Sequence, residues 1–242
     1  MKKLSKIFIL LLIIPSAAFN QSDTSKLFLK SNLVKHFSAP ILLAGTSIYT
    51  LNKNVPLNKF DVQKSIVTNY PNFHTKADDY LLYVPVAITY GIGLIDNNYT
   101  KNDFTNRSIL LVKSAIIMSA IVYPAKYIFA VERPDNSEFD AFPSGHTSNA
   151  FMMATFMHEE LKHKSIWYSI GAYSIATSVG VMRMLNNRHW NSDVLMGAAI
   201  GIASTKIAYL THKFKWGKDS SISLNFTPYF LVQSSKFKVE GY

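Results

Sequence analysis

Long apolar stretches separated by short polar segments dominate the chain after residue 79. They lie at residues 80–95, 108–125, 147–157, 165–182 and 194–209, and Lys113 and Lys206 are their only charged residues. Glycine and alanine recur inside them, as they do in helices that pack closely together. Alternation of apolar and polar positions with regular turn signals is missing, which argues against an all-β chain. The pattern predicts an all-α fold, a bundle of about five to six helices with polar clusters at one end.

The pattern differs at the two ends of the chain. Residues 1–19 combine lysines, an apolar run and small residues, which indicates a signal peptide or an uncleaved signal anchor. Residues 20–79 form an N-terminal extension, in which residues 52–79 are expected to be solvated loop with one short helix at most. The helical domain is expected over residues 80–218. Residues 219–242 alternate apolar and polar positions, which predicts a short strand-like tail outside the bundle.

The apolar segments leave two relations to a membrane open. A membrane span needs about 20 apolar residues, and only 165–182 is uncharged for close to that length. If 80–95 and 108–125 cross in opposite directions, the polar clusters at 126–146 and 183–193 lie outside the cytoplasm. A soluble periplasmic bundle also places them there. Both versions predict a bacterial envelope protein whose active face is periplasmic, and the apolar composition favours membrane association.

The composition and charge of the chain limit the kinds of partner that it is expected to bind. The 242 residues suffice for one buried domain, and 48% hydrophobic against 17% charged residues excludes a disordered chain. A net charge of +10 favours anionic partners. Basic residues are scattered and no nucleic-acid-binding motif is present, so a phosphorylated lipid or small phosphate ester fits better than nucleic acid. The absence of cysteine excludes a thiol nucleophile.

The first polar cluster contains Lys126 and Arg133, followed by Pro134. A spacing of seven residues is nearly two helical turns, so both cations are predicted on one face of a helix that the proline ends. Alone, the pair is also explained by a lysine that reaches past an apolar surface and an ordinary surface arginine.

The second cluster is the run Pro143-Ser144-Gly145-His146, directly before an apolar segment. Proline and glycine predict a sharp turn, and the free N–H groups of the following helix form an anion site. The Ser144 hydroxyl and the Gly145 amide can donate to a phosphoryl oxygen, with His146 beside it. An ordinary capping turn has the same sequence features.

The third cluster contains Arg183, His189 and Asp193. Four residues separate the histidine from the aspartate, which predicts both on one turn of a helix. The carboxylate then accepts a proton from one imidazole nitrogen and leaves the other nitrogen free as a nucleophile. A purely structural His–Asp pair is the alternative.

Together the clusters read Lys-x6-Arg-Pro, Pro-Ser-Gly-His and Arg-x5-His-x3-Asp. This pattern resembles the signature of the type 2 phosphatidic acid phosphatase and vanadium haloperoxidase superfamily, and the resemblance covers about residues 80–211. One position departs from it, because Met182 stands where the family usually has a serine, which removes one hydroxyl donor. Arg188 lies outside the signature and is interpreted as a surface charge.

The resemblance implies a role for each matching residue and no metal or other cofactor. His189 would attack phosphorus and form a phosphohistidine, Asp193 would orient it, and His146 would protonate the leaving oxygen. The phosphoryl oxygens would be held by Lys126, Arg133, Ser144, Gly145 and Arg183.

The implied function is an envelope phosphatase that hydrolyses a phosphate monoester or pyrophosphate, with a lipid as the favoured substrate. A soluble periplasmic acid phosphatase with broad substrates is one alternative. A vanadate-dependent haloperoxidase would use the same pocket, but those proteins are usually longer. A non-catalytic protein that binds lipid headgroups is the third alternative, and the intact His146, His189 and Asp193 argue against it.

Overall fold

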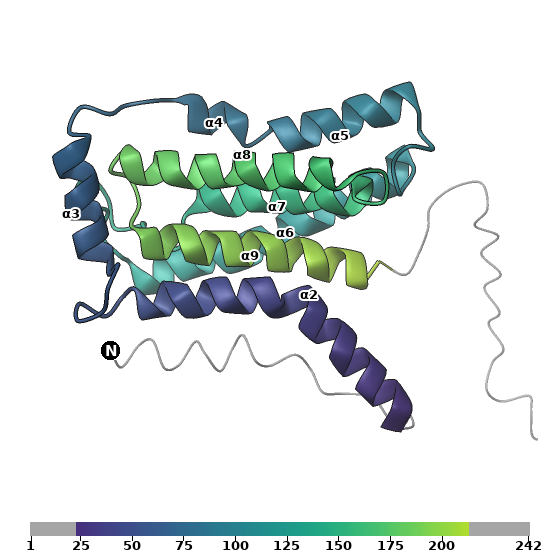
Figure 1. Cartoon of the computed structure of the whole chain (residues 1–242), viewed down its shortest axis with the longest axis horizontal. Helices are drawn as coiled ribbons and strands as arrows, with labels where there is room; N and C mark the ends of the chain where they lie inside the picture. Colours follow the sequence, from purple (N-terminus) through teal and green to yellow (C-terminus); the bar gives the residue numbers. More distant parts are fainter. Residues whose placement is uncertain (1–22, 213–242) are drawn as a thin grey trace, which may run out of the picture.

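The structure, a computed structural model, describes residues 23–212, and all regular secondary structure in this range is helical (Figure 1). The all-α prediction is therefore confirmed for these residues. The expected leader at 1–19 and the strand-like tail at 219–242 lie outside them. The helices are α2 (Asp23–Tyr49), α3 (Lys59–Asn69), α4 (Ala77–Leu81), α5 (Val84–Ile95), α6 (Phe104–Phe129), α7 (Gly145–Leu161), α8 (Ile166–Leu185) and α9 (Asn191–Leu210).

Helix α7 is the centre of the bundle. Most of its side chains are buried, and it packs against α5, α6, α8 and α9. Met152, Met157 and Leu161 belong to one apolar core, which also includes Ala172 and Val179 of α8. Because α7 is covered on all sides, the start of this helix has a fixed position relative to its neighbours.

Two glycines let α9 approach α7 closely. A Cβ atom at Gly201 would lie 2.3 Å from the Ser148 carbonyl oxygen, and one at Gly197 would lie 2.6 Å from the Ser144 carbonyl oxygen. No side chain fits at such distances, so the backbones of the two helices are in contact. This contact places the start of α9 beside the start of α7.

The predicted helix over 80–95 is two helices. Helix α4 ends at Leu81, and α5 begins at Val84 with Pro85 in its first turn. Proline is favoured there because the first amides of a helix have no partner within the helix. The break lets the start of α4 lie close to the polar clusters while α5 packs against α7.

The N-terminal part packs onto the bundle. Residues 52–79 contain α3 and the first three residues of α4, so the prediction of one short helix at most is wrong. Helix α2 lies against α9, where the Ser47 hydroxyl donates to the Ser192 carbonyl oxygen at 2.7 Å. The expectation of solvated surface is wrong for Asp78, whose exposed fraction is 1%.

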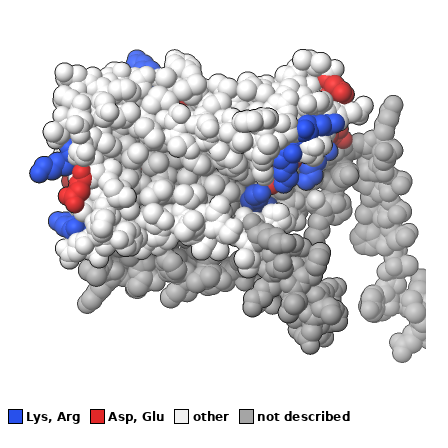
Figure 2. Space-filling view, in the orientation of Figure 1, with Lys and Arg blue, Asp and Glu red and all other residues white. Residues whose placement is uncertain are grey.

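Charged residues gather mainly at the two ends of the face shown in Figure 2, and the surface between them is largely uncharged. Helices α6 and α9 are each long and apolar enough to cross a membrane by length and hydropathy, although Lys113 and Lys206 interrupt them. Over its most apolar window α6 is 22% buried, against 56% for α9. Val112, Ile116 and Tyr123 are among the exposed side chains of α6. This helix therefore presents apolar side chains outward.

Candidate active site

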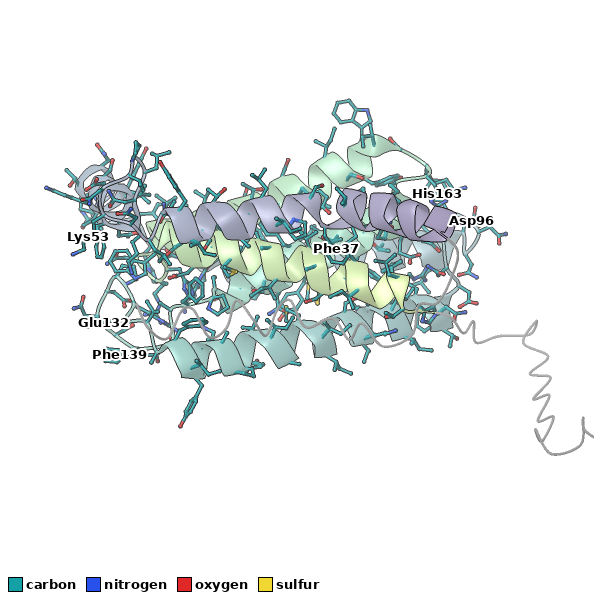
Figure 3. The ribbon with its side chains drawn as sticks, turned by 90° about the horizontal axis from the view of Figure 1, so that it is seen from below. Phe37, Lys53, Asp96, Glu132, Phe139 and His163 are labelled. Carbon is teal, nitrogen blue, oxygen red and sulfur yellow. The ribbon has the colours of Figure 1, made fainter. Side chains whose placement is uncertain are left out.

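The three polar clusters meet at one end of the bundle. The end of α6, the starts of α7 and α9 and the end of α8 carry them, and α4 lies against α7 and α8. Figure 3 shows Lys53, Glu132 and Phe139 at this end, with Asp96 and His163 at the opposite one.

Lys126 and Arg133 do not share a helical face, and that prediction is wrong. Helix α6 ends at Phe129, because Ala130 takes a left-handed conformation with φ of 43°. Pro134 could not have continued the helix, but the helix stops before reaching it. Lys126 lies in the last turn, and Arg133 lies in the following loop.

The two cations still meet, and Asp140 is the residue that joins them. Arg133 Nε donates to Asp140 Oδ1 at 2.7 Å. The Lys126 ammonium bonds the Asp140 carbonyl oxygen and lies 3.4 Å from Oδ2. Burial alone would raise the pKa of Asp140, but the hydrogen bond from Arg133 and the charge of Lys126 lower this pKa below its ordinary value. Asp140 is therefore an ionised carboxylate between two predicted phosphate-binding groups.

The loop between α6 and α7 folds back to make this contact. The Arg133 amide donates to the Glu138 carbonyl oxygen, and the Ala141 amide donates to the Val131 carbonyl oxygen, both at 2.9 Å. The Glu138 carboxylate also pairs with Arg133 at 2.8 Å. Sequence reasoning missed both acids, and their only signal was their place between the first two clusters.

Ser144 caps helix α7. Its hydroxyl oxygen accepts a hydrogen bond from the Thr147 amide at 3.4 Å, and the residue is fully buried. Its predicted donation to a phosphoryl oxygen stays a prediction. Gly145 is the first residue of the helix, so its amide is not used within the helix. A Cβ atom at Gly145 would lie 3.7 Å from Lys126 Cε, which places the lysine side chain beside Gly145.

Helix α4 supplies two carboxylates to the site that sequence reasoning did not single out. Asp78 Oδ2 accepts from Arg183 Nη1 at 2.7 Å, and Asp79 Oδ1 lies 2.9 Å from His146 Nε2. Arg183 Nε is buried without a hydrogen-bond partner among the described residues. Buried donors are normally satisfied, so this N–H is available to an anion.

His189 precedes α9 and is not on its first turn, so the prediction of a shared helical turn with Asp193 is wrong. Trp190 is the N-cap, and Asp193 Oδ2 accepts from the Trp190 amide at 2.9 Å. His189 Nδ1 lies 3.7 Å from that carboxylate oxygen but 2.8 Å from the Ala141 carbonyl oxygen. A carbonyl oxygen only accepts, so Nδ1 carries the proton and Nε2 has a free lone pair.

Both histidines are held toward the neutral form. Burial lowers the pKa of His189, and the charges of Arg183 and Lys126 act in the same direction against the Asp193 carboxylate. Burial and then the charge of Arg183 lower the pKa of His146, while Asp79 acts in the opposite direction. Arg183 thus acts on both imidazoles. Arg188 pairs instead with Asp135 at 3.0 Å, consistent with its place outside the signature.

The arrangement therefore brings a neutral imidazole with a free nitrogen together with basic side chains and a second imidazole. Basic groups and helix N-terminal amides bind tetrahedral oxyanions, and a neutral imidazole is a competent nucleophile. A helical bundle with such a site is typical of the phosphoryl-transfer enzymes in the superfamily that the sequence resembles. Residues 108–216 of this chain match the model of the PAP2 superfamily.

A more particular likeness is to the lipid A 1-phosphatase of Porphyromonas gingivalis. The two sequences are 34% identical over 181 residues, which is 74% of this chain. The chain spans 38% of the length of that relative.

Two solved structures are similar to the chain at lower identity. Aquifex aeolicus LpxE has a TM-score of 0.49 and 19% identity, and the match covers 65% of this chain and 98% of that one. A transmembrane PAP2-type phosphatidylglycerolphosphate phosphatase from Bacillus subtilis has a TM-score of 0.39 and 23% identity, with coverages of 89% and 100%.

Proposed function

We propose that this chain is a metal-independent phosphatase that hydrolyses a lipid phosphate monoester or pyrophosphate through a phosphohistidine. The observation that carries the proposal is the state of His189. Its Nδ1 N–H donates to the Ala141 carbonyl oxygen at 2.8 Å, and burial lowers its pKa, which favours the neutral ring with Nε2 unprotonated. A buried neutral imidazole beside basic side chains suits nucleophilic attack on phosphorus better than headgroup binding alone.

The basic groups would stabilise the transferring phosphoryl group. Lys126, Arg133 and Arg183, with the Gly145 amide and the Ser144 hydroxyl, are the donors proposed for its oxygens. Charge on these oxygens is best stabilised by donors already fixed in place. Arg183 is fixed by Asp78, and the other two cations are fixed by Asp140. A substrate phosphate would replace part of the Asp140 carboxylate's contacts with Lys126 and Arg133.

The proposed reaction has two steps that balance in protons. In the first, His189 Nε2 bonds to phosphorus, the bond to the leaving oxygen breaks, and protonated His146 gives its proton to that oxygen. In the second, His146 takes a proton from water as the water oxygen attacks phosphorus, and His189 leaves as the neutral imidazole. Asp193 would orient His189 and stabilise its positively charged form.

A lipid substrate at the membrane surface is supported by two features. The relative from Porphyromonas gingivalis is named for a phosphatase of lipid A. The site lies at one end of a bundle whose α6 presents exposed apolar residues along its length. We propose that the uncharged middle of the bundle contacts the membrane and that the site faces the periplasm.

The test is phosphate release by the purified chain in detergent with a chelator present. We expect hydrolysis of a lipid A-type glycolipid phosphate or of phosphatidic acid without added divalent metal, with inhibition by vanadate. His189→Ala should lose all of it, whereas Arg188→Gln, which removes a nearby charge outside the signature, should keep most. Loss of wild-type activity with chelator that magnesium or zinc restores would contradict the proposed mechanism.

A further inference from the structure

Helix α4 places adjacent carboxylates on two different groups of the site. Asp78 is buried against Arg183, while the side chain of Asp79 is 47% exposed and contacts His146. Neither aspartate lies in residues 108–216, the segment that matches the PAP2 superfamily. The contact from Asp79 to His146 joins positions 67 residues apart in the chain.

The position of α4 is fixed by the loop that leads to His189. The Thr75 amide donates to Asn186 Oδ1, and Asn186 Nδ2 donates back to the Thr75 carbonyl oxygen, each at 2.9 Å. Asn186 follows directly after α8, which carries Arg183. The start of α4 is therefore tied to the same loop as the site, which holds the backbone of α4 near His146.

A carboxylate accepts hydrogen bonds and donates none when ionised. His146 Nε2, at 2.9 Å from Asp79 Oδ1, is therefore the nitrogen that keeps its proton. In the protonated imidazole the proton available for transfer is then the one on Nδ1. An adjacent carboxylate also favours the positively charged imidazolium over the neutral ring.

We propose that Asp79 is the positioning residue of the general acid: it holds His146 by Nε2, so that Nδ1 delivers the proton to the leaving oxygen. This inference deepens the proposed function and rests on it. During the first step the Nδ1–H bond breaks and the leaving oxygen gains that proton. The Nε2–H bond to Asp79 remains, and the neutral imidazole is ready to accept a proton from water.

The groups around His146 act on its pKa in opposite directions. Burial and the charge of Arg183 lower the pKa of His146, and Asp79 and Asp78 raise it. The acid form is needed for proton donation, so activity on a poor leaving group falls as pH rises through the pKa of His146. Removing the Asp79 charge would lower that pKa further and move this loss of activity to lower pH.

The experiment compares Asp79→Asn with the wild type on phosphatidic acid and on nitrophenyl phosphate across pH. We expect the alkaline limb of kcat/KM on phosphatidic acid to move about one unit to lower pH, with about a tenfold loss above it. Nitrophenyl phosphate, whose leaving group needs little protonation, should lose much less. Asp79→Glu keeps a carboxylate at this position, so its alkaline limb should lie close to the pH of the wild-type limb. Glu132→Gln is the control, because it removes an exposed carboxylate at the same end of the molecule.

A structural role for Asp79 gives a different result. An exposed ion pair contributes little to folding, and its loss would lower thermal stability and both activities alike without moving the alkaline limb. An unmoved limb in Asp79→Asn, or one that moves equally in Glu132→Gln, would overturn the inference.

A second measurement separates this inference from the proposed function. NMR titration of ¹⁵N-histidine-labelled protein, with the His146 signal assigned through His146→Ala, reports the pKa and tautomer directly. We expect the proton on Nε2 in the wild type and a lower pKa in Asp79→Asn. If the wild type lacks phosphatase activity but shows this shift, the proposed function fails and the Asp79–His146 pair stands. If the pKa of His146 is the same in Asp79→Asn as in the wild type, the inference about Asp79 and His146 is wrong whatever the activity.

Discussion

The rings of the two histidines in the site have different hydrogen-bond partners. His189 donates from Nδ1 to a backbone carbonyl oxygen, and His146 contacts a carboxylate through Nε2. A carbonyl fixes the tautomer but stabilises a positive ring less than a carboxylate does. The partner of His189 therefore suits a neutral nucleophile, whereas the partner of His146 opposes the lowering of its pKa by burial and by Arg183.

This difference predicts how each histidine responds to the leaving group. His146→Ala removes only the proton donor, so it should lose about 10²- to 10⁴-fold on phosphatidic acid and much less on nitrophenyl phosphate. His189→Ala removes the nucleophile and should be inactive on both esters. Single-turnover rates on the two esters, with trapping of the phosphoenzyme, provide the measurement.

The assignment of roles fails under either of two results. Equal ratios of the two rates in both variants would mean that His146 does not act through the leaving group. A covalent phosphate trapped in His189→Ala would mean that another residue is the nucleophile. His158→Ala serves as the control, because this histidine lies in the last turn of α7, far from the start that carries His146.

The sequence could predict which residues gather but not all of their partners. Lys126, Gly145, His146, Arg183 and His189 were singled out by spacing and by resemblance. The Ala141 carbonyl could not be, because it reaches His189 across 48 positions and a backbone oxygen has no residue type. Asp79 looked like one acid in a polar loop, since only the folded position of α4 brings it to His146.

Among the helices, the sequence predicted the apolar segments well and their ends poorly. The segments at 108–125 and 194–209 fall within α6 and α9, and the segment at 165–182 falls within α8 except for its first residue, which is the N-cap. Apolar composition identifies what is buried, whereas an end depends on local backbone geometry and capping. Ala130 adopts a left-handed conformation that its residue type disfavours, so no simple signal marked the end of α6 before Pro134.

The contact between α7 and α9 predicts a strong asymmetry between two glycines. Gly201→Ala would place a methyl group 2.3 Å from the Ser148 carbonyl oxygen, and the helices would have to separate. We expect a loss of about 1–3 kcal/mol in stability, together with reduced activity, because Ser148 lies one turn from Ser144. The measurement is thermal unfolding in detergent with activity followed in parallel.

Gly171→Ala is the matched control in α8. A Cβ atom there meets no other atom within 4 Å, and the residue is exposed. Alanine is the better helix former by about 1 kcal/mol, so this variant should be equal to the wild type or more stable. A Gly201→Ala variant as stable as Gly171→Ala would show that the two helices are not in backbone contact.

For the molecule as a whole, the two ends of the bundle differ in chemistry. The loop 130–141 and the site lie at one end, and the turn between α7 and α8, with Lys162, His163 and Lys164, lies at the other. Cytoplasmic loops of membrane proteins are enriched in lysine and arginine. The proposed orientation, with the site in the periplasm, places this basic turn on the cytoplasmic side.

The absence of cysteine from the sequence makes this orientation directly testable. Ser137→Cys introduces one exposed thiol in the loop beside the site, and His163→Cys introduces one at the opposite end. With a maleimide that cannot cross membranes, applied to spheroplasts, we expect Cys at position 137 to react at once. Cys at position 163 should react only after the membrane is disrupted, because an intact bilayer would separate it from the reagent.

Equal reaction of both thiols in intact spheroplasts would favour the soluble periplasmic phosphatase, since no bilayer would then lie between the two ends. Reaction at position 163 alone would reverse the orientation and place the site in the cytoplasm, where a periplasmic phosphate ester could not reach it.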